Sequence, residues 1–272
     1  MEKERLDILL VKKGFFATRE KAKRGIMAGE VLVENQKDNK VGQRIRIDSN
    51  ISILKKRTVY VGRGGDKLEK AIKVFNVPVQ KKRVIDIGAS TGGFTDCLLE
   101  FGAKKVYCID VGYGQLAWKL QKDKRVEIMD RTNIRYLTAD KFDRLFELAV
   151  IDVSFISLDK VLPAAYNLIM ENGELIALIK PQFEAGRDFI QKGGLIRKAE
   201  VHQMVIKKVG TVVFKLGFNI LGLTFSPLKG ASGNIEYLIY LTKDFQKERI
   251  KNFPLVIKKV VEQAHHELSR KK

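Results

Sequence analysis

Cysteine, histidine and long apolar runs are scarce in this chain of 272 residues. Its two cysteines, Cys97 and Cys108, are too few for a disulfide framework and lack the spacing of metal ligands. Three histidines (His202, His265 and His266) argue against a histidine metal site, and we assign no specific role to the last two. No stretch approaches the roughly 18 apolar residues of a membrane-spanning helix, and the N-terminus lacks the apolar segment of a signal peptide. We therefore expect a cytoplasmic protein without a resident metal.

Positive charge is in large excess, with 51 Lys and Arg against 32 Asp and Glu, which gives a net charge of +19. Residues 1–60 carry 15 basic and 8 acidic side chains, and residues 243–272 carry 9 and 4, so both ends are more basic than the middle. Such a surplus predicts a polyanionic partner, either nucleic acid or an anionic membrane surface. Because no spanning segment is present, nucleic acid is the favoured partner.

The first 60 residues predict a small α+β domain. Apolar spacing and short alternating runs indicate helices over 5–11 and 21–27 and strands over 31–35 and 44–48. Thr18 is the expected N-cap of the second helix. That helix brings Arg19, Lys23 and Arg24 onto neighbouring turns, a basic face suited to phosphates, although an ordinary solvated face is the alternative.

Three pieces of this region resemble, in order and spacing, the αL RNA-binding domain of small-subunit ribosomal protein four. They are Arg5-Leu6-Asp7 and the runs over 18–22 and 26–34. The same domain also precedes pseudouridine synthases and several RNA methylases. The resemblance implies RNA binding, which we assign to Arg5, Arg19, Lys23, Arg24 and, beyond this domain, Arg63.

Strands and helices alternate from residue 84 to residue 242. The expected strands cover 84–87, 106–109, 126–129, 148–151, 175–179, 220–225 and 235–241, and helices are expected over 162–170 and 200–216. This alternation predicts an α/β fold with a doubly wound, mainly parallel, seven-stranded sheet. We expect three parts: 1–60, 61–242 and a basic helical tail over 243–272 that packs on the second part.

A glycine-rich turn follows the first of these strands, where a ligand can approach the backbone closely. Its sequence, Asp86-Ile87-Gly88-Ala89-Ser90-Thr91-Gly92-Gly93-Phe94, is neither a Walker phosphate loop nor the dinucleotide fingerprint. The acid before the first glycine would repel a pyrophosphate and suits a cationic ligand. Asp110 and Asp130 end the next two strands, where a ribose and an adenine amino group would lie.

This run of residues resembles the S-adenosylmethionine loop of class I (Rossmann-like) methyltransferases, whose cofactor carries a positive sulfonium and amino group. The resemblance implies S-adenosylmethionine as cofactor. Its expected contacts are Asp86, Gly88, Ser90, Thr91, Gly92 and Phe94 in the loop, Asp110 at the ribose and Asp130 at the adenine.

Four charged residues lie at positions where a soluble domain has little structural use for them: Lys67, Asp152, Lys180 and Glu236. Asp152 and Lys180 end two buried strands, and surface ion pairs are the alternative reading. A Lys-Asp-Lys-Glu set is what ribose 2′-O-methyltransferases of the FtsJ type carry. A ribose hydroxyl must lose its proton as the methyl group transfers, and a lysine can act as the base. In this reading Lys180 is the base and Asp152 positions it.

The motifs together look like the TlyA family, long labelled haemolysin A. They are the αL domain, Arg63-Gly64-Gly65-x-Lys67, the loop from Asp86 to Asp96, the run 131–135, Asp152-Val153-Ser154-Phe155-Ile156-Ser157 and Lys180-Pro181-Gln182-Phe183-Glu184. The resemblance covers nearly the whole chain. It implies a 2′-O-methyltransferase that acts on cytidine ribose in ribosomal RNA, with ribosomal RNA or ribosomal subunits as partner, no membrane, and a monomer favoured.

Two other functions compete with this one. The haemolysin label suggests a membrane-active protein, which would need an amphipathic helix with a broad apolar face. An RNA-binding protein that senses S-adenosylmethionine without catalysis is the second alternative. The complete set of four charged residues argues against it, because a binding protein needs no proton acceptor.

Overall fold

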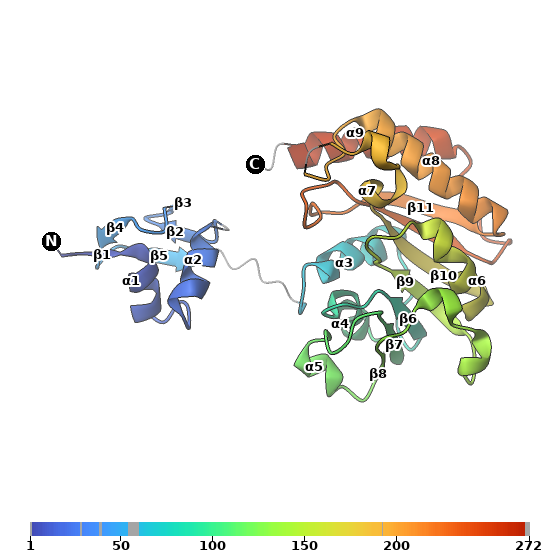
Figure 1. The fold of residues 1–272 in the computed structure, drawn as a ribbon, viewed down its shortest axis with the longest axis horizontal. Coiled ribbons are helices and arrows are strands. Elements are labelled where there is room, and N and C mark those ends of the chain that lie inside the picture. The colour runs from blue at the N-terminus through green and yellow to red at the C-terminus, as the bar shows by residue number, and fades with distance from the viewer. Residues whose placement is uncertain (1, 28, 38–39, 54–59, 192, 270–272) are drawn as a thin grey trace. The chain divides into compact units, whose positions relative to one another are not determined.

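A computed structural model describes residues 2–27, 29–37, 40–53, 60–191 and 193–269. The chain divides into two compact units, Met1–Thr58 and Val59–Lys272, each with its own core (Figure 1).

The first unit is a small α+β domain. Its elements are β1 (Lys3–Arg5), α1 (Leu6–Lys12), α2 (Arg19–Met27), β2 (Val31–Val33), β3 (Gln36–Lys37), β4 (Arg44–Arg46) and β5 (Ile51–Ile53). Leu6, Leu9 and Leu10 of α1 pack against Ala22 and Ile26 of α2. The helical spacing of these apolar residues is the reason that both helices form at this length.

The predicted elements of this unit are present, but several bounds differ: α2 begins at Arg19 rather than at residue 21, and the strand expected over 44–48 ends at Arg46. Thr18 caps α2, since its Oγ1 accepts a hydrogen bond from the backbone N–H of Lys21 at 3.3 Å. The strand expected over 31–35 ends at Val33, because Glu34 and Asn35 have φ of 50° and 62° and turn the chain into β3. Such left-handed pairs make the tight turns of β-hairpins.

The second unit is a doubly wound sheet with helices on both faces (Figure 1), as the alternating pattern predicts. Among the described residues the sheet has seven strands in the order β11-β12-β10-β9-β6-β7-β8, with β12 antiparallel to both neighbours. The strands are β6 (Arg83–Ile87), β7 (Lys105–Ile109), β8 (Val126–Met129), β9 (Phe146–Ile151), β10 (Ile169–Ile179), β11 (Asn219–Phe225) and β12 (Tyr237–Thr242). The fold class predicted from the sequence is confirmed.

The helices pack against the two faces of the sheet. They are α3 (Gly64–Phe75), α4 (Gly93–Glu100), α5 (Trp118–Gln121), α6 (Leu162–Leu168), α7 (Pro181–Glu184), α8 (Ala199–Lys215) and α9 (Phe253–Ser269). One apolar cluster joins the sheet to α3 and α4, and a second joins it to α6, α8 and α9. The C-terminal helix α9 therefore belongs to the core of this unit, where it contacts α8 and β11.

The strand β10 begins earlier than expected. The sequence predicts a helix over 162–170 and a strand over 175–179, whereas α6 ends at Leu168 and β10 starts at Ile169. Ile169 pairs with Phe146 of β9, and the register shifts before pairing resumes at Glu174. This tertiary pairing overrides the helical spacing of residues 162–170.

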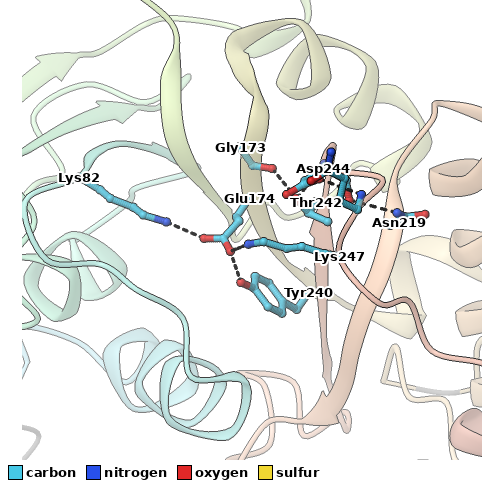
Figure 2. Close-up of polar contacts among 9 residues, drawn as sticks. Lys82, Gly173, Glu174, Asn219, Tyr240, Thr242, Asp244 and Lys247 are labelled. Atoms are coloured by element: carbon cyan, nitrogen blue, oxygen red, sulfur yellow. Dashed lines mark hydrogen bonds and ion pairs between the residues drawn. The ribbon is translucent and has the colours of Figure 1, made fainter.

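A buried carboxylate joins β10 and β12 where the parallel strands have their amino-terminal ends, opposite to their carboxyl ends (Figure 2). Glu174 is 1% exposed and accepts hydrogen bonds from the Nζ atoms of Lys82 and Lys247, each at 2.6 Å, and from the hydroxyl of Tyr240. Burial acts to raise the pKa of Glu174, but these donors hold it below its usual value. The contact ties β10 to the segments before β6 and after β12.

Candidate active site

The carboxyl ends of the parallel strands carry the loops that form the site, as the doubly wound topology requires. The backbone N–H of Gly88 donates to the carbonyl of Ile109 at 2.8 Å, and that of Asp152 donates to the carbonyl of Ile87 at 3.0 Å. The loops after β6, β7 and β9 are thereby joined to one another.

Glycine is required at Gly88 and Gly92 of the first loop. Gly88 has φ of +86°, and a Cβ there would lie 2.6 Å from the carbonyl oxygen of Asp152. Gly92 has φ of +94°, and a Cβ there would lie 2.2 Å from a methyl group of Leu120. The loop can therefore pass close to its neighbours only without side chains at these positions.

Asp110 and Asp130 hold the backbone of the neighbouring loops. Asp110 accepts hydrogen bonds from the N–H groups of Ser90 and Gly112, both at 2.8 Å. Asp130 accepts one from the N–H of Gly114 at 2.8 Å. The predicted ribose and adenine acids are therefore anchors of the loops at this edge of the sheet.

Asp86 lies below the loop rather than in a cavity. It is fully buried and accepts a hydrogen bond from the hydroxyl of Thr95 at 2.6 Å. Burial raises its pKa to about 7. The structure therefore does not bring Asp86 to the surface that a ligand would touch, and its other carboxylate oxygen has no hydrogen-bond partner among the described residues.

The four charged residues form two lysine–carboxylate pairs. Lys67 Nζ lies 2.6 Å from Glu236 Oε2, and Lys180 Nζ lies 2.6 Å from Asp152 Oδ1. The two lysines are each 8% exposed and Glu236 is 2% exposed, so these are not surface ion pairs. Strand ends predict that Asp152 and Lys180 lie at the same edge of the sheet. Lys67, in α3, and Glu236 are 169 positions apart and are assigned to the site through the resemblance to FtsJ-type enzymes.

Two adjoining cavities meet at these pairs. The smaller cavity, of about 190 Å³, includes Gly88, Thr91 and Phe94 of the glycine-rich loop, and the larger, of about 610 Å³, includes Lys67 and Glu236. Both are lined by Arg63, Gly64, Ser90, Asp152, Ser154 and Lys180. Gly92, Asp110 and Asp130 are not among the residues that line these two cavities. Lys180 is thus accessible from the loop side and from the larger space.

Two residues of the loop after β9 were not singled out from the sequence. Ser154 Oγ accepts a hydrogen bond from Lys180 Nζ at 2.8 Å, which gives the lysine a second fixed partner. Phe155 is 91% exposed at φ of +63°; the centroid of its ring lies 5.1 Å from that of Phe183, and both residues line the larger cavity. Both stand in the motif that marks Asp152, which is the signal that could have identified them.

The basic residues predicted to bind RNA are placed differently from one another. Arg5 and Arg19 both donate from Nε to the fully buried carboxylate of Asp7, at 3.1 and 2.7 Å, while their side chains stay 39% and 49% exposed. Lys23 pairs with Glu20 at 2.8 Å. Arg63 is exposed beside both cavities, and the side chain of Arg24 lies outside the described residues.

No helix in the described part of the chain is long and apolar enough to cross a membrane.

Comparison with known proteins defines the class first. Residues 60–243 match the FtsJ-like methyltransferase family and residues 4–51 match the S4 domain. The chain is therefore an FtsJ-like methyltransferase that carries an S4 domain.

The particular family follows from closer relatives. The chain is 37% identical to the 16S/23S rRNA (cytidine-2′-O)-methyltransferase TlyA of Mycobacterium tuberculosis, over 87% of this chain and 89% of that protein. It is 41% identical to Hemolysin A of Brachyspira hyodysenteriae, over 87% of this chain and 98% of that protein. A solved structure described as a hemolysin candidate from Streptococcus thermophilus is 46% identical, with a TM-score of 0.79 and coverage of 100% of this chain and 98% of that one. The chain belongs to the TlyA family of methyltransferases.

Proposed function

We propose that this protein uses S-adenosylmethionine to methylate the ribose 2′-hydroxyl of a cytidine in ribosomal RNA. The observation that carries the proposal is the pair of buried lysine–carboxylate contacts at the junction of two cavities. The smaller cavity is lined by the glycine-rich loop, and the larger has room for a nucleoside. A relative that shares 37% of its residues is named for this reaction.

The residues present fit the expected cofactor. Gly88, Thr91 and Phe94 of the glycine-rich loop line the smaller cavity, and Asp110 and Asp130 place negative charge at the ends of β7 and β8. A sulfonium and an amino group are attracted by such charge. When bound, S-adenosylmethionine supplies the methyl group. Ser90, Thr91 and Phe94 would hold it in the loop, with Asp110 toward the ribose, Asp130 toward the adenine, and Asp86 supporting the loop from below.

Lys180 is the proposed base. Asp152 Oδ1 and Ser154 Oγ fix its Nζ from two sides. The third position on Nζ, which carries an N–H bond or a lone pair, is therefore oriented rather than free to rotate. In this position it accepts the proton of the 2′-hydroxyl or orients that oxygen for transfer. Lys67 and Glu236 complete the charge balance on the other side of the larger cavity.

The N-terminal unit is proposed to bind the RNA. Its match to the S4 domain and the exposed guanidinium groups of Arg5 and Arg19 support this role. We propose the boundaries 1–60, 61–242 and 243–272 for the RNA-binding part, the methyltransferase part and the C-terminal helical segment. The protein is proposed to act as a monomer on ribosomal RNA in the cytoplasm.

The test is transfer of labelled methyl groups to ribosomal subunits purified from cells that lack the enzyme. We expect label in the RNA and, after complete digestion to nucleosides, label in methylated cytidine. Absence of transfer, or label in another nucleoside, would contradict the proposal. Transfer that requires no added protein identifies a contaminating activity, so a reaction without enzyme is the control.

A further inference from the structure

A buried histidine lies next to the larger cavity and takes no part in the proposed reaction. His202, in the first turns of α8, is fully buried. Its Nε2 lies 3.1 Å from the carbonyl oxygen of Ile196, and its Nδ1 lies 2.8 Å from the hydroxyl of Tyr237. The half-buried His265 of α9 brings its Nε2 to within 3.0 Å of the same Nδ1.

These contacts fix where the protons are. A carbonyl oxygen only accepts hydrogen bonds, so Nε2 of His202 must donate to Ile196. The Nδ1 of a neutral ring is then an acceptor, and the hydroxyl of Tyr237 donates a hydrogen bond to it. Burial lowers the pKa of His202 to about 4 and raises that of Tyr237, so that near neutral pH both groups are uncharged and the hydroxyl keeps its proton.

The two partners of His202 do not line the larger cavity themselves, but each lies close in the chain to residues that do. Ile196 follows a short hairpin in which Gln191 pairs with Leu195, and Ile190 and Gly194 of this segment line the cavity. Tyr237 directly follows Glu236, which lines the cavity and pairs with Lys67. The ring of His202 therefore joins the hairpin to the start of β12.

The buried Asn234 holds the same segment through two further hydrogen bonds. Its Oδ1 accepts from the N–H of Ile196 at 2.8 Å, and its Nδ2 donates to the carbonyl of Gly194 at 2.8 Å. The backbone of Ile196 is thus held at its N–H by Asn234 and at its carbonyl by His202. Removal of the histidine frees the carbonyl side of this segment but leaves the contacts of Asn234 in place.

We infer that His202 is a positioning residue for RNA methylation: it fixes the part of the larger cavity's wall that Ile190 and Gly194 form relative to Glu236. The inference rests on the proposed function, because the cavity is taken to receive the target nucleotide. The glycine-rich loop shares none of the contacts of His202, so binding of S-adenosylmethionine is independent of it. The C-terminal helix α9 contacts His202 through His265.

The test compares His202→Phe with His202→Gln in the full chain. Phenylalanine keeps a ring but leaves the buried carbonyl of Ile196 without a donor, so kcat/KM for ribosomal subunits should fall about 10- to 100-fold. Glutamine offers both a donor and an acceptor and should restore kcat/KM to within about threefold of wild type. The Kd of S-adenosylmethionine, measured by calorimetry, should change less than twofold in both variants.

The outcomes separate the inference from the function on which it rests. If wild-type protein transfers no methyl group, the proposed function fails. If wild type is active and His202→Phe keeps its kcat/KM, or loses cofactor binding as well, the positioning role is wrong. Equal losses in both variants would also overturn it, because a role in hydrogen bonding requires rescue by glutamine.

Two further variants keep the test decisive. If His202→Phe does not fold, the double variant Tyr237→Phe, His265→Phe removes both polar groups that contact Nδ1 and leaves the ring of His202 in place. We expect kcat/KM to fall in this double variant as well, and an unchanged kcat/KM would overturn the inference. His266→Phe is the matched control, because His266 lies on the same helix and is exposed; it should behave as wild type.

Discussion

Lys180 is held by an oxygen atom of Asp152 and one of Ser154, both in the loop after β9, and Pro181 begins α7 directly after it. A lysine fixed in this way has little rotational freedom left, so its distance from a bound ribose is set before the substrate arrives. The role proposed for it depends on deprotonation, which distinguishes it from a purely electrostatic role.

Substitution of Lys180 by arginine tests that role. A guanidinium keeps the positive charge but cannot lose a proton at working pH. Since loss of a general base typically costs about 10²–10⁴ in rate, Lys180→Arg should be nearly as inactive as Lys180→Ala. Single-turnover transfer to ribosomal subunits measures this, with cofactor and RNA affinity as controls that should stay within a few-fold of wild type. If the arginine variant keeps more than roughly a tenth of the rate, Lys180 only orients or neutralises charge.

The pH dependence of stability tests the burial of His202. Its pKa in the folded chain is about 4, below the ordinary value of 6.5, because burial disfavours the charged ring. Above pH 6.5 the ring is neutral in both states. As the pH falls from 6.5 toward 4, the unfolded chain binds a proton that the folded chain does not, and the free energy of unfolding falls by up to about 3 kcal/mol.

The measurement is urea unfolding followed by the fluorescence of Trp118, the one tryptophan of the chain, which lies in the second unit. His202→Gln has no such proton to bind, so its stability should fall less between pH 7 and pH 4.5 than that of wild type. Parallel curves for the two proteins would show that the ring titrates normally.

At the scale of elements, Asp7 at the start of α1 organises the N-terminal unit. Burial acts to raise its pKa, but Arg5 and Arg19 hold the pKa below its usual value. The carboxylate thereby aligns two exposed guanidiniums from different elements, β1 and α2. Arg46 and Asp48 repeat the same local contact, with Nε donating to Oδ1 at 2.9 Å, but Asp48 is exposed and no second arginine pairs with it among the described residues.

This repetition provides a matched pair of substitutions. Asp7→Asn and Asp48→Asn each remove one negative charge, so charge alone predicts that both tighten RNA binding. If alignment of Arg5 and Arg19 matters, Asp7→Asn should instead weaken the affinity for ribosomal subunits about tenfold at fixed salt, while Asp48→Asn should not weaken it. Equal affinities of the two variants would remove Arg5 and Arg19 from the proposed RNA contact.

The loop after β6 depends on Asp110, which binds the backbone of Ser90 and Gly112. Asp110→Ala removes this anchor and the proposed charge-assisted contact to ribose hydroxyls, worth roughly 1.5–3 kcal/mol. Calorimetry should show S-adenosylmethionine bound about one to two orders of magnitude more weakly. Asp123→Ala, whose carboxylate pairs with Arg125, is the control and should bind normally. Unchanged affinity in Asp110→Ala would move the cofactor away from this loop.

Most strands of the sheet could be predicted from sequence because their central residues form short apolar runs. The positions of Asp152 and Lys180 in the site could also be predicted, because parallel strands place their carboxyl ends at one edge of the sheet. The start of β10 could not be predicted, since Ile169 joins the sheet through pairing with Phe146 rather than through its local pattern. The contact of His265 could not be predicted either, because its partner His202 is 63 residues away on another helix.

At the scale of the whole molecule, the chain combines a basic S4 unit with a methyltransferase unit. The net charge of +19 and the concentration of basic residues in the first 60 positions suit a large polyanion better than a small substrate. The central claim that joins the two units is that the methyl group goes to a ribose oxygen of ribosomal RNA and not to a base.

Alkaline hydrolysis of the labelled RNA tests this claim most directly. Alkali cleaves RNA through the free 2′-hydroxyl, so a 2′-O-methyl group protects the bond beside it, whereas methylation of a base does not. After transfer by the full chain to ribosomal subunits, the label should appear in alkali-resistant dinucleotides. Label recovered in mononucleotides would mean that a base is the acceptor, and the role assigned to the two lysine–carboxylate pairs in 2′-O-methyl transfer would be wrong.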